Sequence, residues 1–303
     1  MPEGILNGRI LKGVGGAYDV LLDNGQRFSA KPRGIFRKQK MSPLAGDLVT
    51  CQASGDSDFP LQILTINKRR NTLMRPPLAN LDLLILTFAC QDPDPDLVLL
   101  DKLLIYAAKN NMDCLICFTK VDLNPEENER LVDMYRAAGY PVISSSLDAP
   151  ASDIIEEQIR GQVVAFAGPS GVGKSTLLNE VSGRVEMITG DVSERLGRGK
   201  HTTRHSELFP MAGGFLVDTP GFTSLDITQM DIRPEDLIFG YPEFLESAHE
   251  CKFQDCHHLT ETDCRVREQA DFSKSAAERY ERYAAFRLVL NQLPIHHWKK
   301  KED

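Results

Sequence analysis

Hydrophobic and polar residues alternate along residues 1–70, in short runs broken by glycine and proline. The runs are GRILKG, AYDVLLDNGQRFSA, DLVTCQ and LQILTIN, and the Asn24-Gly25 pair in the second run predicts a hairpin turn. Alternation with a period of two directs one face of each strand toward a core. This first region is therefore predicted to be a small β-barrel.

The pattern changes at about residue 82, where apolar residues form continuous runs. LDLLILTFA, DCLICFTK, YPVISSS, QVVAFAG and GGFLVD have the composition of buried strands, and helical stretches such as DLVLLDKLLIYAAKNN separate them. Strands that alternate with helices predict a parallel sheet covered on both faces. From about residue 232 a Cys/His cluster and a charged helix, SAAERYERYAAFRLVLNQL, replace the strands. We therefore expect three domains, over residues 1–70, 71–231 and 232–303.

Composition is that of an ordinary globular protein, with 42% hydrophobic and 26% charged residues. The longest apolar run, LDLLILTFAC, is too short to span a bilayer, and no signal peptide opens the sequence. We expect a cytoplasmic monomer with no membrane partner. The net charge is −8, yet residues 1–70 hold 11 Lys and Arg against 6 Asp and Glu. This basic region predicts an RNA-binding face, with phosphate contacts from Arg33, Arg37, Lys38 and Lys40.

A glycine-rich segment, GPSGVGKST, follows the strand VVAFA and precedes the helix STLLNEVSG. This is the context of a P-loop, whose main-chain N–H groups surround phosphate oxygens at a helix N-terminus. Lys174 would reach the β- and γ-phosphates, and Ser175 would coordinate Mg²⁺. The predicted phosphate-binding residues are Gly168, Pro169, Ser170, Gly171, Val172, Gly173, Lys174, Ser175 and Thr176.

Two further segments are expected to contact the γ-phosphate. GGFLVDTPG ends a strand with Asp218, which could hold the magnesium shell while the amides up to Gly221 meet the phosphate. The polar segment GRGKHTTRH is typical of a mobile switch that delivers a threonine to the metal. Either Thr202 or Thr203 could serve, and we assign the magnesium contact to Thr203.

Recognition of the base is expected upstream of the P-loop. The strand DCLICF ends in TKVD (Thr119, Lys120, Val121 and Asp122). An aspartate there can accept two hydrogen bonds from guanine that adenine cannot supply. A second strand, PVISSS, brings the small residues Ser144 and Ser145 toward the guanine carbonyl. The nucleotide should therefore be GTP.

The order of these segments is permuted, because ordinary GTPases run from the P-loop through the switches to the base-reading segments. A domain whose termini lie close together can be cut at one loop and rejoined elsewhere without changing the folded site. The joining segment would be about residues 147–162.

Three thiolates and an imidazole in CKFQDCHHLTETDC predict a tetrahedral, structural zinc site. The thiolates are Cys251, Cys256 and Cys264, and the imidazole is that of His257 or His258. By contrast, Cys114 and Cys117 lie three apart on a predicted strand and point to opposite faces, which indicates buried packing.

A basic barrel followed by TKVD, GPSGVGKST, KHTT, DTPG and a metal cluster resembles the RsgA/YjeQ family of circularly permuted GTPases, over essentially the whole chain. The resemblance implies an N-terminal OB-fold β-barrel, a central α/β permuted P-loop GTPase domain and a C-terminal α-helical zinc-binding domain. It also implies binding to the small ribosomal subunit and its rRNA late in maturation, with GTP hydrolysis stimulated by the ribosome. Of the two candidate zinc ligands it favours His258.

Catalytic residues are expected to be Lys174, Thr203 and His201. Phe222 follows DTPG where many GTPases have the glutamine that orients water. The resemblance therefore points to His201, whose neutral ring could orient or deprotonate water, with His205 as the alternative. A second departure is Thr119, where many GTPases have asparagine, and this predicts modest nucleotide affinity.

Two other functions compete with a ribosome-stimulated GTPase that uses GTP with Mg²⁺ and one structural Zn²⁺. One is a GTP-gated RNA-binding scaffold in which hydrolysis is incidental. The other, a P-loop kinase or ATPase, is disfavoured by Asp122 and by the lack of an arginine-rich lid segment.

Overall fold

The computed structural model describes residues 4–38, 41–74, 77–184, 206–218 and 227–293. The chain forms two compact units. One comprises Met1–Leu84, Ala151–Phe166 and Lys174–Phe222, and the other comprises Ile85–Pro150, Ala167–Gly173 and Thr223–Asp303.

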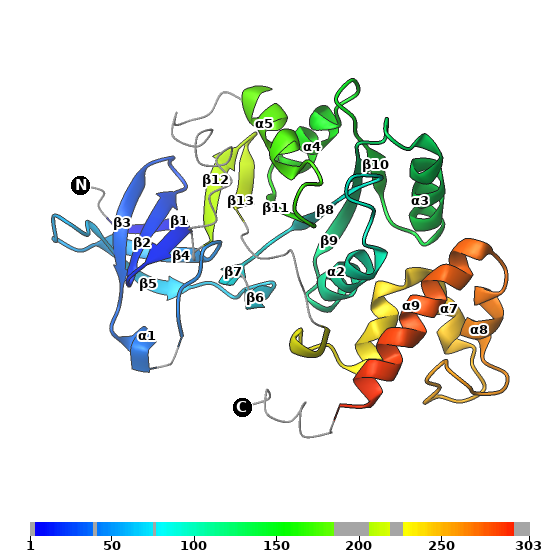
Figure 1. Ribbon diagram of the computed structural model, residues 1–303. Helices are drawn as coiled ribbons and strands as arrows, with labels where there is room; N and C mark the ends of the chain where they lie inside the picture. The colour runs from blue at the N-terminus through cyan, green and yellow to red at the C-terminus, as the bar shows by residue number, and fades with distance from the viewer. Residues whose placement is uncertain (1–3, 39–40, 75–76, 185–205, 219–226, 294–303) are drawn as a thin grey trace. The chain divides into compact units, whose positions relative to one another are not determined.

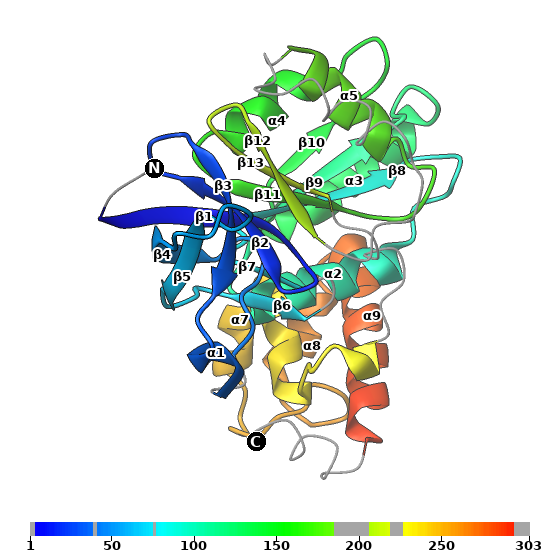
Figure 2. The ribbon, with the colours of Figure 1, turned by 90° about the vertical axis from the view of Figure 1, so that its left-hand side faces the viewer.

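The N-terminal strands close into a barrel with the order β1-β2-β3-β5-β4 (Figures 1 and 2). Neighbouring strands of the barrel are antiparallel except β3 and β5, which are parallel, as in an OB-fold barrel. Apolar side chains from every strand fill its interior, among them Ile10, Val20 and Ile63, which are fully buried. The predicted barrel and its hairpin at Asn24-Gly25 are confirmed. The strands are β1 (Ile5–Val14), β2 (Ala17–Leu22), β3 (Arg27–Pro32), β4 (Leu48–Ala53) and β5 (Leu61–Ile66), and the short helix α1 (Ile35–Lys38) follows β3.

Within the same unit, the barrel packs against two strands that lie after residue 206. Strand β1 lies beside β12 (Glu207–Met211), which is followed by β13 (Gly214–Asp218) (Figure 2). The Nζ atom of Lys12 lies 3.4 Å from Oε1 of Glu207, and the guanidinium of Arg9 lies 5.1 Å from the centre of the Phe215 ring. The barrel is therefore in direct contact with strands β12 and β13.

Six strands form a sheet in the order β10-β9-β8-β11-β13-β12. The pairs β10–β9 and β11–β13 are parallel, as predicted, but β12 runs antiparallel to β13. The sequence did not predict β12, because Pro210 interrupts its pattern; proline is tolerated there because β12 is at the edge of the sheet. The strands are β8 (Leu83–Ala89), β9 (Asp113–Thr119), β10 (Val142–Ser144), β11 (Val163–Ala167), β12 (Glu207–Met211) and β13 (Gly214–Asp218); a separate pair consists of β6 (Thr72–Met74) and β7 (Pro77–Ala79).

Four helices connect these strands, and two have side-chain caps. The Oδ1 atom of Asp96 accepts a hydrogen bond from the main-chain N–H of Leu99 at 2.9 Å, and Asn124 caps the next helix in the same way through Glu127 at 3.1 Å. Helix α4 lies within the predicted joining segment, residues 147–162. The helices are α2 (Leu97–Lys109), α3 (Pro125–Ala137), α4 (Ser152–Ile159) and α5 (Lys174–Arg184).

The C-terminal region is helical, as predicted. Tyr241, Phe244 and Tyr283 are buried among its helices, and α8 contacts both α7 and α9. The charged pattern of α9 nevertheless includes a fully buried arginine, Arg279. The elements are the 3-10 helices η1 (Ile227–Gln229) and η2 (Pro234–Gly240) and the α-helices α7 (Pro242–His249), α8 (Arg265–Ala270) and α9 (Lys274–Asn291). Within the described residues, no helix combines the length and the apolar composition needed to cross a membrane.

Candidate nucleotide site and metal centre

The glycine-rich loop connects the end of β11, at Ala167, to the start of α5, at Lys174. Gly168 has a φ of +146°, and a Cβ atom on it would lie 2.0 Å from the carbonyl oxygen of Thr87. Only glycine fits there, because any side chain would collide with the neighbouring main chain. Gly171 and Gly173 also have positive φ, so the loop has the tight turns expected of a P-loop.

Thr119, at the end of β9, contacts the P-loop directly. Its Oγ1 atom donates a hydrogen bond to the carbonyl oxygen of Val172 at 2.5 Å and lies 3.3 Å from the carbonyl oxygen of Phe88. The hydroxyl has one hydrogen, and the shorter distance assigns it to Val172. Thr119 is 4% exposed. The threonine that replaces the usual asparagine thus still joins the base motif to the phosphate loop.

The other residues of TKVD lie at the start of the following turn. Lys120 has a φ of +52°, and its Nζ atom donates a hydrogen bond to the carbonyl oxygen of Asp92. The N–H of Val121 donates to the carbonyl oxygen of Ser145 at 3.4 Å, while Asp122 is exposed. The two predicted base-reading segments are therefore adjacent.

Ser144 and Ser145 have different environments at the end of β10. Ser145 is buried, and its N–H donates to the carbonyl oxygen of Phe118 at 2.8 Å. Ser144 is exposed, and its hydroxyl donates to Oδ1 of Asn128, on α3, at 2.8 Å. Asn128 was not predicted as a site residue. Nothing in its sequence context distinguishes it from other polar residues of a helix.

Three predicted phosphate-binding residues form the first turn of α5. Lys174 is half-buried, and burial lowers the pKa of its amine. Ser175 and Thr176 are exposed. Asp218 is the last residue of β13, but its side chain is not among the described parts of the structure. The other predicted residues of the two switch segments lie outside the described residues altogether: His201, Thr202, Thr203, His205, Gly221 and Phe222.

The predicted zinc ligands Cys251, Cys256, His258 and Cys264 come together, with their ligand atoms all within 4.8 Å of one another. The Nδ1 atom of His258 lies 3.5 Å from the sulfur of Cys251 and 3.5 Å from that of Cys264. A tetrahedral zinc with ordinary Zn–S and Zn–N bond lengths requires about 3.5 Å between such atoms. His258 is buried, whereas the rival ligand His257 is exposed. The donor set thus fits a zinc ion.

Titration behaviour around this cluster depends on burial. Burial raises the pKa of Cys256 to about 12, and lowers the pKa of His258, to which nearby Arg287 also contributes. The lowered pKa of His258 favours the neutral ring, which can coordinate through Nδ1, and the raised pKa of Cys256 means that a bound cation would favour its thiolate.

The loop that carries His258 is held by main-chain hydrogen bonds. The carboxylate of Glu261 accepts from the N–H groups of His257, Leu259 and Thr260 at 2.8 to 3.0 Å. Burial alone would raise the pKa of Glu261, but these donors and its own N–H lower it to about 2. The hydroxyl of Tyr280, on α9, donates to the carbonyl oxygen of His258 at 2.8 Å.

Cys117 is buried, as predicted, whereas Cys114 is half-buried. Cys114 and Cys117 lie on β9, and burial raises the pKa of both thiols, that of Cys117 to about 12. Both are therefore protonated at neutral pH, which is the state of inert, packed cysteines.

The P-loop follows a central strand of the sheet, β11, whereas the strands that carry the base motif and its partner segment, β9 and β10, come earlier in the chain. This order defines a circularly permuted P-loop GTPase, here with a five-stranded barrel before it and a Cys₃His cluster after it.

Comparison with known proteins leads to the same class. The family described as RsgA GTPase matches residues 66–228, and the RsgA N-terminal domain matches residues 7–58. The ABC transporter family also matches, over residues 156–301, a stretch that begins just before the P-loop strand. Because a P-loop recurs in many nucleotide-binding proteins, this third match adds no separate class.

Curated relatives cover nearly the whole chain. "Small ribosomal subunit biogenesis GTPase RsgA" of Clostridium botulinum is 42% identical over 281 residues, which are 92% of this chain and 95% of that protein. The protein of the same name from Ruminiclostridium cellulolyticum is 42% identical over 300 residues, 98% of this chain and 97% of its own. The chain therefore belongs to the RsgA GTPase family.

Solved structures agree. The crystal structure of YloQ, a circularly permuted GTPase, is similar with a TM-score of 0.79 and 32% identity, covering 96% of this chain and 97% of its own. YjeQ from Thermotoga maritima has a TM-score of 0.80 and 29% identity, covering 96% of this chain and all of its own.

Proposed function

We propose that this protein binds GTP and hydrolyses it to GDP and phosphate, and that it acts on the small ribosomal subunit during late maturation. The observation that carries the nucleotide assignment is the hydrogen bond from Thr119 to Val172, because it brings a guanine-type base motif to a P-loop in a permuted chain. Asp122 is the residue that selects guanine, with Lys120 along the ring and Ser144 and Ser145 beside the guanine carbonyl. This assignment makes adenine nucleotides poor ligands.

Phosphate binding falls to the loop from Gly168 to Gly173 and to the first turn of α5. Lys174 neutralises the β- and γ-phosphates, and the amides up to Gly221 meet the γ-phosphate. Ser175 and Thr203 would hold Mg²⁺, with Asp218 in its outer shell. When bound, this ion neutralises charge on the phosphates.

His201 is our candidate for positioning the attacking water, since Phe222 cannot do so. His201→Ala and Thr203→Ala should slow hydrolysis and spare GTP binding, whereas Lys174→Ala and Ser175→Ala should weaken binding itself. Equal loss of binding in His201→Ala would assign that residue a structural role instead.

The ribosomal part of the proposal is supported by the relatives' names and by the basic barrel. Two curated relatives that span nearly the whole chain are named as small ribosomal subunit biogenesis GTPases. In this chain the barrel region carries a net positive charge and packs against β12 and β13. Binding of rRNA to the barrel could therefore displace β12 and β13, the strands next to the two proposed switch segments.

Zinc is proposed as a structural ion, one per chain. Its four ligands would come from Cys251, Cys256, His258 and Cys264, which leaves no coordination position for water or substrate. We further propose a monomer in the cytoplasm without a membrane partner, because ribosome assembly intermediates are soluble particles.

Steady-state GTP hydrolysis with and without purified small subunits is the decisive measurement, with ATP as the control nucleotide. The proposal is supported if small subunits raise the rate of GTP hydrolysis by orders of magnitude and do not raise that of ATP hydrolysis. Tight GTP-dependent subunit binding without stimulated turnover would instead favour the RNA-binding scaffold, an alternative kept open by Phe222. Equal use of ATP would overturn the base assignment.

A further inference from the structure

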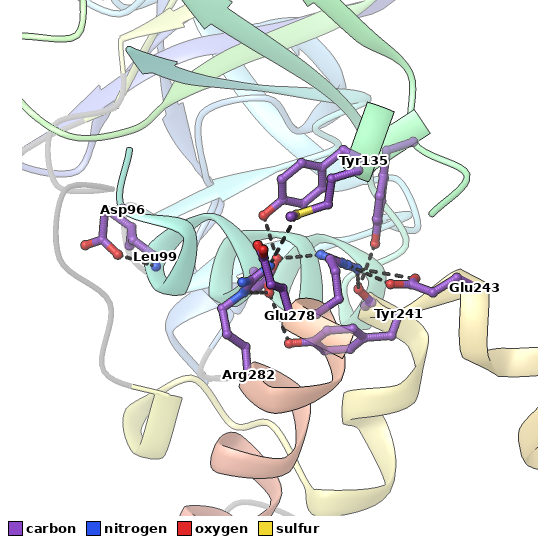
Figure 3. A network of polar contacts seen from close by, with 12 residues as sticks. Asp96, Leu99, Tyr135, Tyr241, Glu243, Glu278 and Arg282 are labelled. Carbon is purple, nitrogen blue, oxygen red and sulfur yellow. Dashed lines mark hydrogen bonds and ion pairs between the residues drawn. The ribbon is translucent and has the colours of Figure 1, made fainter. Parts of the chain in front are cut away.

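A buried carboxylate on α2, Asp101, lies where the C-terminal helices meet the GTPase region. Figure 3 labels three of its hydrogen-bond partners, Tyr135, Tyr241 and Arg282. The Oδ1 atom of Asp101 accepts hydrogen bonds from Tyr135 at 3.0 Å and from Arg279 at 2.5 Å. Its Oδ2 atom accepts from Nε of Arg282 at 2.5 Å and from Tyr241 at 3.3 Å. One fully buried side chain thus links α2 to α3, α9 and the residue between η2 and α7.

Arg279 completes this network from α9. Its guanidinium also donates to Glu243 at 2.6 Å and to the carbonyl oxygen of Gly240 at 3.0 Å, and it lies over the ring of Tyr241 at 4.5 Å. Burial alone would lower the pKa of Arg279, but Asp101 and Glu243 outweigh burial and raise it well above its usual value. Removing either carboxylate would leave the buried guanidinium with one charged partner in place of two, which is costly in a buried site.

Main-chain packing makes the same joint close. Gly240 lies so near α2 that a Cβ atom on it would be 2.8 Å from Cα of Ile105. At the far end of α2, Lys109 forms an ion pair with Asp236 at 2.8 Å. Helix α2 is therefore closely packed against the C-terminal region at Gly240 and tied to it by an ion pair at Lys109.

The start of α2 leads directly to the nucleotide site. Asp96 caps the helix, and the segment before it, residues 91–95, follows β8. The carbonyl oxygen of Asp92 accepts from Nζ of Lys120, and a Cβ atom on Gly171 would lie 3.9 Å from Cδ of Pro93. The segment is thus bonded to the base-motif lysine and lies close to the P-loop.

We propose that Asp101 is a positioning residue through which the C-terminal region sets the placement of Lys120 and thereby the rate of GDP release. A small subunit that binds the C-terminal region would shift α2, and with it residues 91–95, relative to the base motif. The inference rests on the proposed function, since it requires that Lys120 contact the guanine ring. It assigns the C-terminal region to nucleotide exchange, whereas His201 and Thr203 serve hydrolysis.

The chain offers a control that bypasses α2. Arg130, on α3, pairs with Glu278, on α9, at 2.7 Å (Glu278 is labelled in Figure 3). Glu278→Gln weakens attachment of the same C-terminal helix without touching Asp101. Arg282→Gln removes one donor to Asp101, and Arg282→Lys retains the positive charge.

The test is the release rate of fluorescent GDP from the full-length, zinc-loaded protein. Arg282→Gln should raise this rate about fivefold, as expected for a coupling near 1 kcal/mol. Arg282→Lys should release GDP at nearly the wild-type rate. Glu278→Gln should leave the release rate within about twofold of the wild type, a change well below that coupling. Circular dichroism melting of each variant checks that the fold persists.

A double-mutant cycle locates the effect at the base motif. In a Lys120→Ala background, Arg282→Gln should change GDP release by less than about twofold, because the affected contact is already gone. The same fivefold change in both backgrounds would overturn the inference, and so would an unchanged rate in Arg282→Gln alone. A wild-type protein that binds no GDP would refute the proposed function itself, whereas normal binding with unaltered release would refute only the role of Asp101.

Discussion

The side-chain hydroxyl of Thr119 donates to the main-chain carbonyl of Val172 at 2.5 Å, across 53 residues of sequence. Thr119 is nearly inaccessible to solvent, so the bond is shielded from competing water. A threonine at this position therefore fixes the end of β9 against the glycine-rich loop through its hydroxyl.

Thr119→Val, which keeps the shape and removes the hydroxyl, should weaken GTP binding. The buried carbonyl of Val172 would lose its donor, and a lost hydrogen bond of this kind costs about 1 kcal/mol, or about fivefold in affinity. Thr119→Ser keeps the hydroxyl and should bind nearly as well as the wild type. Calorimetric titration with GTP distinguishes them, and equal affinities would show that the bond does not support the site.

Asp122→Asn should reverse the preference for guanine. The amide presents a donor where guanine offers one too, whereas xanthine offers a carbonyl at that position. The loss for GTP should be about 2 kcal/mol or more, since a paired polar group is replaced by a mismatch. Titrations with GTP and XTP measure it, and unchanged GTP binding would show that the base is read elsewhere.

Gly168→Ala should abolish nucleotide binding and destabilise the fold. The new methyl group would lie 2.0 Å from the carbonyl oxygen of Thr87, so the main chain must shift at the start of the P-loop. Gly161→Ala is the matched control, because Gly161 also has positive φ but has no atom within 4 Å of the added methyl. Its expected cost is the backbone strain alone, about 1 kcal/mol. Thermal melts and GTP titrations of both variants test the difference, and equal behaviour would mean that the loop relaxes.

His258→Ala should lose zinc, and its neighbour provides the comparison. Of these two histidines, His258 belongs to the cluster of ligand atoms, with Nδ1 3.5 Å from the sulfur of Cys251, so His257→Ala should keep one zinc per chain. Without metal, the loop between α7 and α8 lacks a core of its own and should become protease-sensitive. Metal analysis after dialysis, with limited proteolysis, gives the result. Zinc retained in His258→Ala but lost in His257→Ala would reverse the assignment.

Arg33, Arg37, Lys38 and Lys40 should contribute to RNA binding through counterion release. Replacing all four by glutamine should lower the salt dependence of subunit binding, by about 0.7 to 0.9 in the logarithmic slope for each true phosphate contact. Binding measured from low to moderate salt reports the slope directly. A variant with the wild-type slope would place the RNA contacts on another surface.

Local sequence features predicted much of the architecture. The barrel strands follow from alternation and the Asn24-Gly25 turn, and the P-loop follows from a glycine-rich run between a strand and a helix. Strand β12 was not predicted, because its proline masks a pattern that only an edge position tolerates.

Contacts between distant residues were beyond sequence patterns. Asp101 and Arg279 are 178 positions apart in the sequence. The sequence around each of them predicts an exposed polar residue on an amphipathic helix. The choice of His258 over His257 likewise depends on where Nδ1 points, which adjacent identical residues cannot reveal. The positions of the two switch segments lie outside the described residues, so the roles of His201 and Thr203 rest on sequence.

The joint at Asp101 has a practical consequence for deletion mapping. A chain cut before residue 232 would strip Asp101 of Arg279, Arg282 and Tyr241, leaving Tyr135 as the remaining donor of the four. It would also uncover the side of α2 that Gly240 covers. Such a fragment is a damaged GTPase rather than a minimal one, and activity missing from it cannot be credited to the segment removed. Point variants at the joint keep the helices in place, and they are therefore the better way to measure what the C-terminal region contributes to GTPase activity.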